Sequence, residues 1–223
     1  MAPTDPMTAL HEELAFTLDL VIACGEIAMH YWRSGAKVLA LREKPLGGGP
    51  ITRADTEIND RIVASLRARF PADGVLAEES ADDGHWHRAA RCWYVDPIDG
   101  TREFARGRTG FTVQVGLCIA GDPVLGVVSE PAAGHLSWAV RAPTGSLARR
   151  RLPSGEETDL HPIDAPLDRL VLIGGRMFPL SHQHAIRRAL GVSEARARSV
   201  GSVGDSICAM CWLWCSLRCR WFC

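Results

Sequence analysis

The sequence predicts an α+β or layered α/β fold, with helices outside, a mainly β interior and two subdomains. Three observations predict it. Apolar residues recur at helical spacing over residues 8–33. Two short apolar runs, 74–80 and 92–96, each lead into acidic residues, as buried strands that end at a polar edge do. From residue 111, three β-rich runs are separated by Gly-Asp-Pro and Pro-Ala-Ala-Gly turns.

The elements follow one another with recognisable start and stop signals. Gly35 follows the helix over 8–33, and residues 44–50 (KPLGGGP) have the composition of a loop. A second helix is predicted after Thr52 and Asp55, which sit where a cap would sit, and Pro71 ends it. The strands over 74–80 and 92–96 come next. Residues 111–140 then predict an antiparallel meander.

The remainder of the chain predicts a second unit. Residues 143–166 are rich in Pro, Gly, Ser and charge and predict a linker, followed by a strand at 169–175 and a helix at 181–192. We therefore expect three parts: an α+β domain over 1–160 that carries the metal site, a partial α/β domain over 161–204, and an anomalous tail over 205–223. The second subdomain is incomplete on this division.

Composition excludes several classes of protein. A net charge of −1 leaves no strongly basic surface, so we expect no nucleic-acid partner. The first apolar stretch is interrupted by Asp19 and Glu26, and the N-terminal flank is acidic, so neither a membrane span nor a secretory signal is predicted. We expect a cytoplasmic protein with a small-molecule partner, and a homodimer is compatible with the sequence.

The segment YVDPIDGTREF (94–104) carries the chemistry. Asp96 ends an apolar run, Pro97 lacks an N–H and is expected to stop the strand and turn the chain, and Asp99 is a candidate N-cap. That turn would leave the Ile98 carbonyl free to face a cation. Two carboxylates this close repel by about 4 kcal/mol at 4 Å and an effective dielectric near 20, a cost that a divalent ion reverses.

Two interpretations of this segment stay open on spacing alone. In one, Asp96, Asp99 and the upstream Glu78 supply oxygen ligands to Mg²⁺, and Gly100 and Thr101 open a helix whose N–H groups face phosphate. Hydrolysis of phosphate esters is among the slowest uncatalysed reactions, and two Mg²⁺ ions flanking the phosphate are a common solution. In the other, Asp99 merely caps a helix and Asp96 pairs with an arginine.

A resemblance to a known family favours the first interpretation. The stretches ITRAD (51–55), VLAEES (75–80) and WYVDPIDGTREF (93–104) resemble, in order and spacing, the three signatures of the Mg²⁺-dependent inositol monophosphatase superfamily. The similarity covers roughly residues 8 to 204. It implies a layered αβαβα sandwich, a phosphoric monoester hydrolase activity and Mg²⁺ as the cofactor.

The resemblance also implies roles for individual residues. Glu78, Asp96, Asp99 and the Ile98 main-chain oxygen are implied as metal ligands, and Glu78 also as a partner of the attacking water.

Gly100 and Thr101 are implied to hold phosphate through their N–H groups, and Thr101 to orient the water. Asp55 is implied as the acid that supports Thr101, although it also fits a plain helix cap, and Glu79 is expected to lie outside the ligand set.

The substrate is predicted from the residues after Thr101. "REF" and the following β-rich segment are more similar to the 3′(2′),5′-bisphosphate nucleotidase branch, which converts adenosine 3′,5′-bisphosphate to AMP, than to inositol monophosphatases. Arg102 is a candidate contact for a second phosphate, and a surface role is equally compatible. An inositol or related sugar monophosphatase is the alternative, and a catalytically impaired family member is a third.

The tail departs from the family pattern. The last 16 residues hold five of the eight cysteines and three of the seven tryptophans, and the aspartate that would complete a second metal site is missing there. Cys24, Cys92 and Cys118 instead lie in apolar surroundings, as buried free thiols do. For the tail, a soft-metal site and a membrane-touching segment are weaker interpretations than a shifted reading frame past residue 204.

Overall fold

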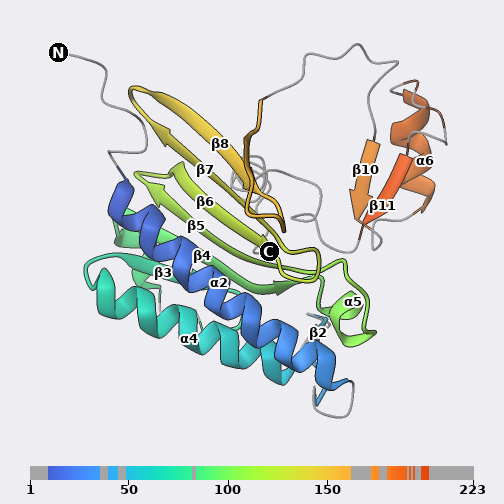
Figure 1. The fold of residues 1–223 in the computed structure, drawn as a ribbon, viewed down its shortest axis with the longest axis horizontal. Coiled ribbons are helices and arrows are strands. Elements are labelled where there is room, and N and C mark those ends of the chain that lie inside the picture. The colour runs from blue at the N-terminus through green and yellow to red at the C-terminus, as the bar shows by residue number, and fades with distance from the viewer. Residues whose placement is uncertain are drawn as a thin grey trace.

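The computed structural model describes residues 10–35, 40–44, 49–81, 84–161, 172–175, 180–189, 191, 193 and 197–200. Its centre is a seven-stranded sheet in the order β3-β4-β5-β6-β7-β8-β9 (Figure 1). Strands β3 and β4 are parallel, and every later neighbouring pair is antiparallel. The strand bounds are β3 (Gly74–Ala77), β4 (Arg91–Asp99), β5 (Thr112–Ile119), β6 (Asp122–Glu130), β7 (His135–Ala142), β8 (Gly145–Arg151) and β9 (Glu157–Asp159).

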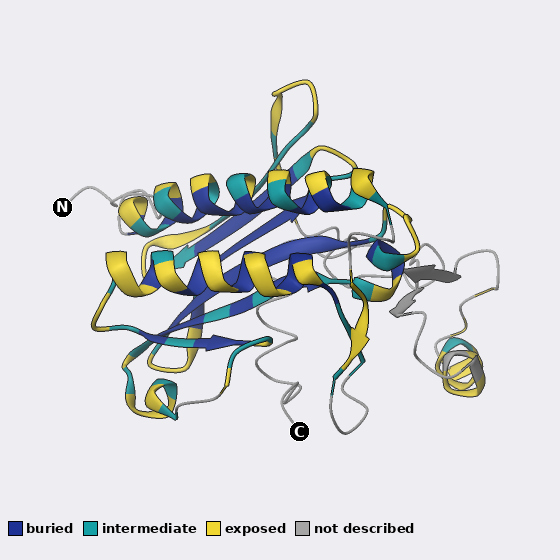
Figure 2. Cartoon of the chain, turned by 90° about the horizontal axis from the view of Figure 1, so that it is seen from below, coloured by how far each residue is buried: buried dark blue, intermediate teal, exposed yellow. Residues whose placement is uncertain are grey.

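Two long helices, α2 (His11–Ser34) and α4 (Arg53–Arg69), lie side by side on one face of this sheet (Figure 1). Their buried residues face the strands and their exposed residues face away (Figure 2). By length and hydropathy α2 alone among the described helices could cross a membrane, but half of its most apolar window is buried inside the protein. Such burial is typical of an amphipathic core helix. The length and hydropathy of α2 are therefore only weak evidence for a membrane role.

Helix α4 begins at the cap that the sequence predicts. The Thr52 side chain accepts from the Asp55 backbone N–H, and the Asp55 carboxylate accepts from the Thr52 backbone N–H, which is a capping box. Both residues are buried. The cap therefore fixes one of the predicted site residues at the first turn of α4.

Aromatic side chains join the helices to the sheet. Phe70, at the end of α4, lies edge-on to Phe16 of α2 with 5.4 Å between ring centroids. The same ring stacks on Trp93 of β4 at 5.2 Å. Trp93 is fully buried, so this contact secures β4 beneath both helices.

Several sequence expectations are confirmed and two are wrong. The helices and the meander β5–β7 are confirmed. Residues 143–166 were expected to form a linker, but β8 and β9 continue the sheet within residues 145–159. Charged side chains do not prevent this, because the arginines of β8 pair with acids across the edge of the sheet, as Arg149 with Asp159 at 2.7 Å.

The turn expected at Pro97 is also wrong in part. Strand β4 runs through Pro97 to Asp99, and its register with β5 shifts between Asp96 and Asp99. Pro97, which has no N–H to donate, lies in a bulge where no ladder hydrogen bond is needed. The pairing of β4 with β5 therefore resumes at Asp99 instead of stopping. The N-cap of the following helix α5 (Thr101–Ala105) is Gly100, in the left-handed region at φ 92°, and no side chain caps it, so Asp99 is not the cap.

The other described elements are smaller. A two-stranded parallel sheet joins β10 (Leu172–Gly175) to β11 (Ala197–Val200), and helix α6 (Leu180–Ala189) lies between them in the chain. Strand β10 and helix α6 fall where the sequence predicts a strand and a helix. The short elements are β1 (Arg42–Glu43), β2 (Pro50–Ile51) and the 3₁₀ helix η2 (His85–Arg88). The division at residue 160 stays a prediction, and the tail over 205–223 lies outside the described residues.

Candidate active site

Parallel pairing of β3 and β4 brings two predicted ligands to one edge of the sheet. Ala77 is the register partner of Val95, and the Glu78 N–H donates to the Val95 carbonyl at 3.1 Å. Glu78 and Asp96 therefore leave neighbouring strands at the same level. Ligand sites in sheets with parallel strands typically form at this carboxyl edge.

The Asp96 carboxyl group is the centre of the acidic cluster. Its Oδ1 atom is buried and has no hydrogen-bond partner in the part of the chain that the structure describes. Burial, followed by the charges of Glu78, Asp99 and Asp55, raises the pKa of Asp96 well above its usual value. A buried acceptor that three other carboxylates surround is stabilised by a positive charge.

Asp99 is held from the neighbouring strand. The bulge in β4 places Asp99 opposite Thr112 and Asp96 opposite Gln114. The Gln114 amide donates from Nε2 to Asp99 Oδ2 at 2.7 Å. The sequence interpretation missed Gln114, although a polar residue inside the apolar run FTVQVGL was a usable signal.

Asp55 and Thr101 meet across the fold. The Thr101 hydroxyl lies 3.0 Å from Asp55 Oδ1 and 2.9 Å from the Ile98 carbonyl oxygen. Asp55 Oδ2 meanwhile accepts from Thr52 at the helix cap, so one carboxylate contacts both Thr101 and the cap. Burial raises the pKa of Asp55, although the hydrogen bonds from Thr52 and Thr101 oppose that shift.

Glu78 and Glu79 share one lysine. The Lys44 ammonium lies 2.6 Å from Glu78 Oε1 and 2.7 Å from Glu79 Oε1. The Glu78 side chain is 39% exposed and Glu79 only 4%, so Glu78 is the accessible member of the pair. Burial raises the pKa of Glu79 to about 7 against the opposing charge of Lys44. Sequence reasoning missed Lys44, which lies in a loop without a motif.

The segment after Gly100 is anchored by aromatic contacts. Phe104 and Phe111 pack edge-to-face at 4.8 Å, and Trp32 of α2 donates to the Arg108 carbonyl at 3.2 Å. The Gly100 carbonyl accepts from the N–H groups of Glu103 and Phe104. These contacts hold the turn that carries Gly100 and Thr101, which lies beside Asp99.

The donor set suits a hard divalent cation. Asp96, Asp99 and Glu78 offer carboxylate oxygens, which Mg²⁺ prefers, and no described residue donates to the buried Oδ1 of Asp96. Within the described residues, however, no three acidic, His or Cys side chains converge into a preformed metal site. The carboxylates do not converge because the Glu78 carboxylate pairs with the Lys44 ammonium and the Asp99 carboxylate accepts from the Gln114 amide.

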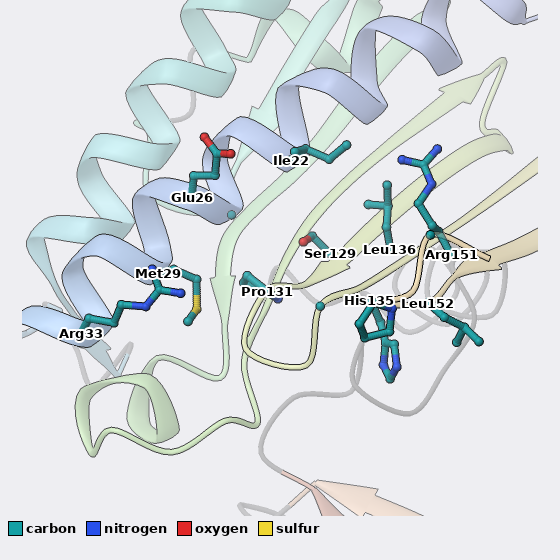
Figure 3. Close-up of a pocket in the computed structure, with 14 residues that line it drawn as sticks. Ile22, Glu26, Met29, Arg33, Ser129, Pro131, His135, Leu136, Arg151 and Leu152 are labelled. Atoms are coloured by element: carbon teal, nitrogen blue, oxygen red, sulfur yellow. The ribbon is translucent and has the colours of Figure 1, made fainter. Parts of the chain in front are cut away.

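A separate pocket of about 710 Å³ lies between α2 and the ends of β6, β7 and β8 (Figure 3). Met29 and Arg33 of α2 face Pro131 and His135 across it (Figure 3). None of the predicted site residues lines this pocket. The acidic cluster and this pocket therefore have separate linings.

With this geometry established, the chain matches the inositol monophosphatase family over residues 9–217. It belongs to that family. Members of the family are phosphatases that hydrolyse phosphate monoesters, and they generally use Mg²⁺.

Curated relatives carry several substrate names. A histidinol-phosphatase of Chlorobaculum parvum is 35% identical over 130 residues, which are 58% of this chain and 48% of the relative. An inositol-1-monophosphatase of Synechocystis sp. is 32% identical over 174 residues, 78% and 55% of the two chains. A 3′(2′),5′-bisphosphate nucleotidase of Salmonella typhimurium is 40% identical over 101 residues, 44% and 39%. The chain thus spans about half the length of these relatives.

The fold also matches solved structures. A Thermotoga maritima inositol monophosphatase superposes with a TM-score of 0.64 at 23% identity, covering 86% of this chain and 69% of that chain. The mixed α+β architecture, with a central sheet flanked by helices, is therefore that of the family.

Proposed function

We propose that this chain is a Mg²⁺-dependent phosphatase that converts adenosine 3′,5′-bisphosphate and water to AMP and phosphate. The observation that supports the metal dependence is the buried Oδ1 of Asp96, which has no hydrogen-bond donor among the described residues and lies near other carboxylates. Asp96, Asp99, Glu78 and the Ile98 carbonyl are the proposed ligands. Bound Mg²⁺ neutralises these charges and stabilises charge on the reacting phosphate.

The chain's own residues then orient the attack. The Thr101 hydroxyl, held between Asp55 Oδ1 and the Ile98 carbonyl, is placed to orient the attacking water. Glu78, the exposed carboxylate of its pair, is the proposed partner of that water. The N–H groups of Gly100 and Thr101 are proposed to hold the phosphate, as the resemblance to the family implies.

The substrate proposal rests on two supports. The match to the Salmonella nucleotidase reaches 40% identity over 101 residues. In addition, α5 and the turn after it carry Arg102, Arg106 and Arg108, which follow the proposed phosphate seat in the sequence. The buried Glu103 pairs with two of these arginines, Arg106 and Arg108. A surplus of guanidinium groups favours a substrate with a second phosphate.

Other phosphate monoesters are the rival candidates. The histidinol-phosphatase relative matches over a longer stretch, 130 residues, than the nucleotidase does. The inositol-1-monophosphatase relative covers 78% of this chain, which keeps the inositol alternative open. A catalytically impaired member of the family is the third candidate. We place the protein in the cytoplasm, as a monomer or homodimer, on sequence features alone.

The experiment is a phosphate-release assay with adenosine 3′,5′-bisphosphate, inositol 1-phosphate and histidinol phosphate, in Mg²⁺ and in EDTA. We expect Mg²⁺-dependent release that is fastest with the bisphosphate, and a loss of at least about 100-fold in Asp96→Asn. Faster turnover of either other substrate overturns the ranking. Absence of release from folded protein with all three in Mg²⁺ supports the impaired-member alternative.

A further inference from the structure

Gln114 has no role in the proposed ligand set, yet its surroundings are unusual. The side chain is fully buried in the middle of β5. Gln114 is the register partner of Asp96 in the pairing of β4 with β5. Its amide nevertheless bonds to Asp99, which lies on the other side of the register shift in β4. Gln114 is therefore the register partner of one aspartate of the DPIDGT segment and the hydrogen-bond donor to the other.

The hydrogen bonds of this amide fix its orientation. Nε2 donates to Asp99 Oδ2 at 2.7 Å and to Thr112 Oγ1 at 2.6 Å. An ionised carboxylate only accepts hydrogen bonds, so the NH₂ group, not the oxygen, must face Asp99. A bond of this kind to a charged acceptor is shorter and stronger than a neutral one.

The amide oxygen gains nothing from this arrangement. Gln114 Oε1 is buried without a hydrogen-bond partner among the described residues, as is Asp96 Oδ1 on the opposite strand. An unsatisfied buried acceptor costs about 1–3 kcal/mol. An apolar residue would avoid that cost, so the contribution of Gln114 must come through its donor side, which bonds the charged Asp99 and the neutral Thr112.

We propose that Gln114 is a positioning residue that orients Asp99 as a metal ligand through its hydrogen bond to Oδ2. This inference rests on the proposed function, because it needs Asp99 to bind a divalent ion. Partners that hold ligating carboxylates from behind commonly change metal affinity 10–100-fold when they are lost, by order of magnitude. Gln114 supplies such a contact to Asp99 from the neighbouring strand.

The test is a titration of the substrate-free protein with Mn²⁺, in which the electron paramagnetic resonance signal of free Mn²⁺ reports binding. Gln114→Met keeps the length of the side chain and removes the donor, and we expect it to weaken Mn²⁺ binding by about 10–100-fold. Gln114→Asn keeps the amide but is one methylene short, and an intermediate loss is expected. If the Met variant does not fold, the Asn variant carries the test.

Thr112→Val is the matched control. It removes the other partner of the same Nε2 atom and leaves the bond to Asp99, so we expect Mn²⁺ affinity within about threefold of the original chain. A purely structural role of the amide predicts equal losses in Thr112→Val and Gln114→Met, which would overturn the inference.

Different results would contradict the positioning role of Gln114 and the proposed metal-dependent function. If the original chain binds Mn²⁺, Asp96→Asn abolishes binding and both Gln114 variants bind as tightly as the original, the positioning role alone is wrong. If the original chain does not bind Mn²⁺, both the metal-dependent function and the role of Gln114 are wrong.

Discussion

The two ends of strand β4 bury acidic groups in opposite surroundings. At its first residue, Arg91 donates to Asp73 at 3.0 Å and to Glu13 at 2.7 Å, and the Trp93 indole donates to Asp73 at 2.8 Å. At its last residues, Asp96 and Asp99 lie near Glu78 and Asp55, and Asp96 Oδ1 has no donor in the described chain.

The first end of the nine-residue strand β4 therefore contributes to stability, and its last end carries the proposed metal ligands. At the Arg91 end every acid has a cation or an indole donor, so the network ties α2 and β3 to β4. At the Asp96 end, burial and the charges of Glu78, Asp99 and Asp55 disfavour the ionised Asp96 carboxylate, which destabilises the fold unless a cation binds beside it. Removing an acid should therefore have opposite effects on stability at the two ends.

The largest stability change is expected at the Arg91 end. Asp73→Asn removes the charge that Arg91 and Trp93 share, and the Asp73 side chain is only 7% exposed. We expect a loss of about 2 kcal/mol in the free energy of unfolding, because the hydrogen bonds from Arg91 and Trp93 lose their charged acceptor. Urea denaturation measures it, and an unchanged Mn²⁺ affinity per folded molecule would show that the effect is purely structural.

The opposite sign is expected at Asp96. In metal-free buffer, Asp96→Asn removes a buried charge that Glu78, Asp99 and Asp55 repel, and we expect a gain of about 1–2 kcal/mol. In excess Mg²⁺ the original chain should be stabilised by binding while the variant should not. Thermal unfolding with EDTA or Mg²⁺ tests this, and a destabilised variant in EDTA would contradict the comparison.

A smaller effect should follow from Glu13→Gln. Arg91 keeps Asp73 in this variant, so we expect a loss of about 1 kcal/mol. Glu12→Gln is the matched control, since Glu12 pairs with Arg69 where both side chains are at least half exposed. Exposed pairs contribute at most about 1 kcal/mol and often nothing measurable. Equal losses in the two variants, measured in urea, would refute the special role of the Arg91 network.

The last prediction concerns the chemical reactivity of three buried thiols and involves no change in stability. Cys92 lies opposite Cys118 in the register of β4 and β5, and Cys24 is buried in α2. Burial raises the pKa of Cys92 to about 11 and those of Cys24 and Cys118 to about 12. Because the thiolate is the reactive form, iodoacetamide at pH 8 should label these three sites at less than about a tenth of the rate in urea. Peptide mapping by mass spectrometry measures the labelling.

The sequence by itself determined the local structure. Helical spacing predicted α2 and α4, the Thr52–Asp55 cap predicted the start of α4, and turn residues predicted the meander. The segment around DPIDGT also predicted the family. These features are local, because periodicity and capping depend on residues within a few positions of one another.

Only the tertiary structure decided which groups meet in the acidic cluster. Parallel pairing set Glu78 beside Asp96, and the bulge across Pro97 turned Asp99 toward Gln114. The contact of Lys44 with Glu78 joins residues 34 positions apart. Strand register and long-range ion pairs depend on how distant segments pack, so no local pattern in the sequence specifies them.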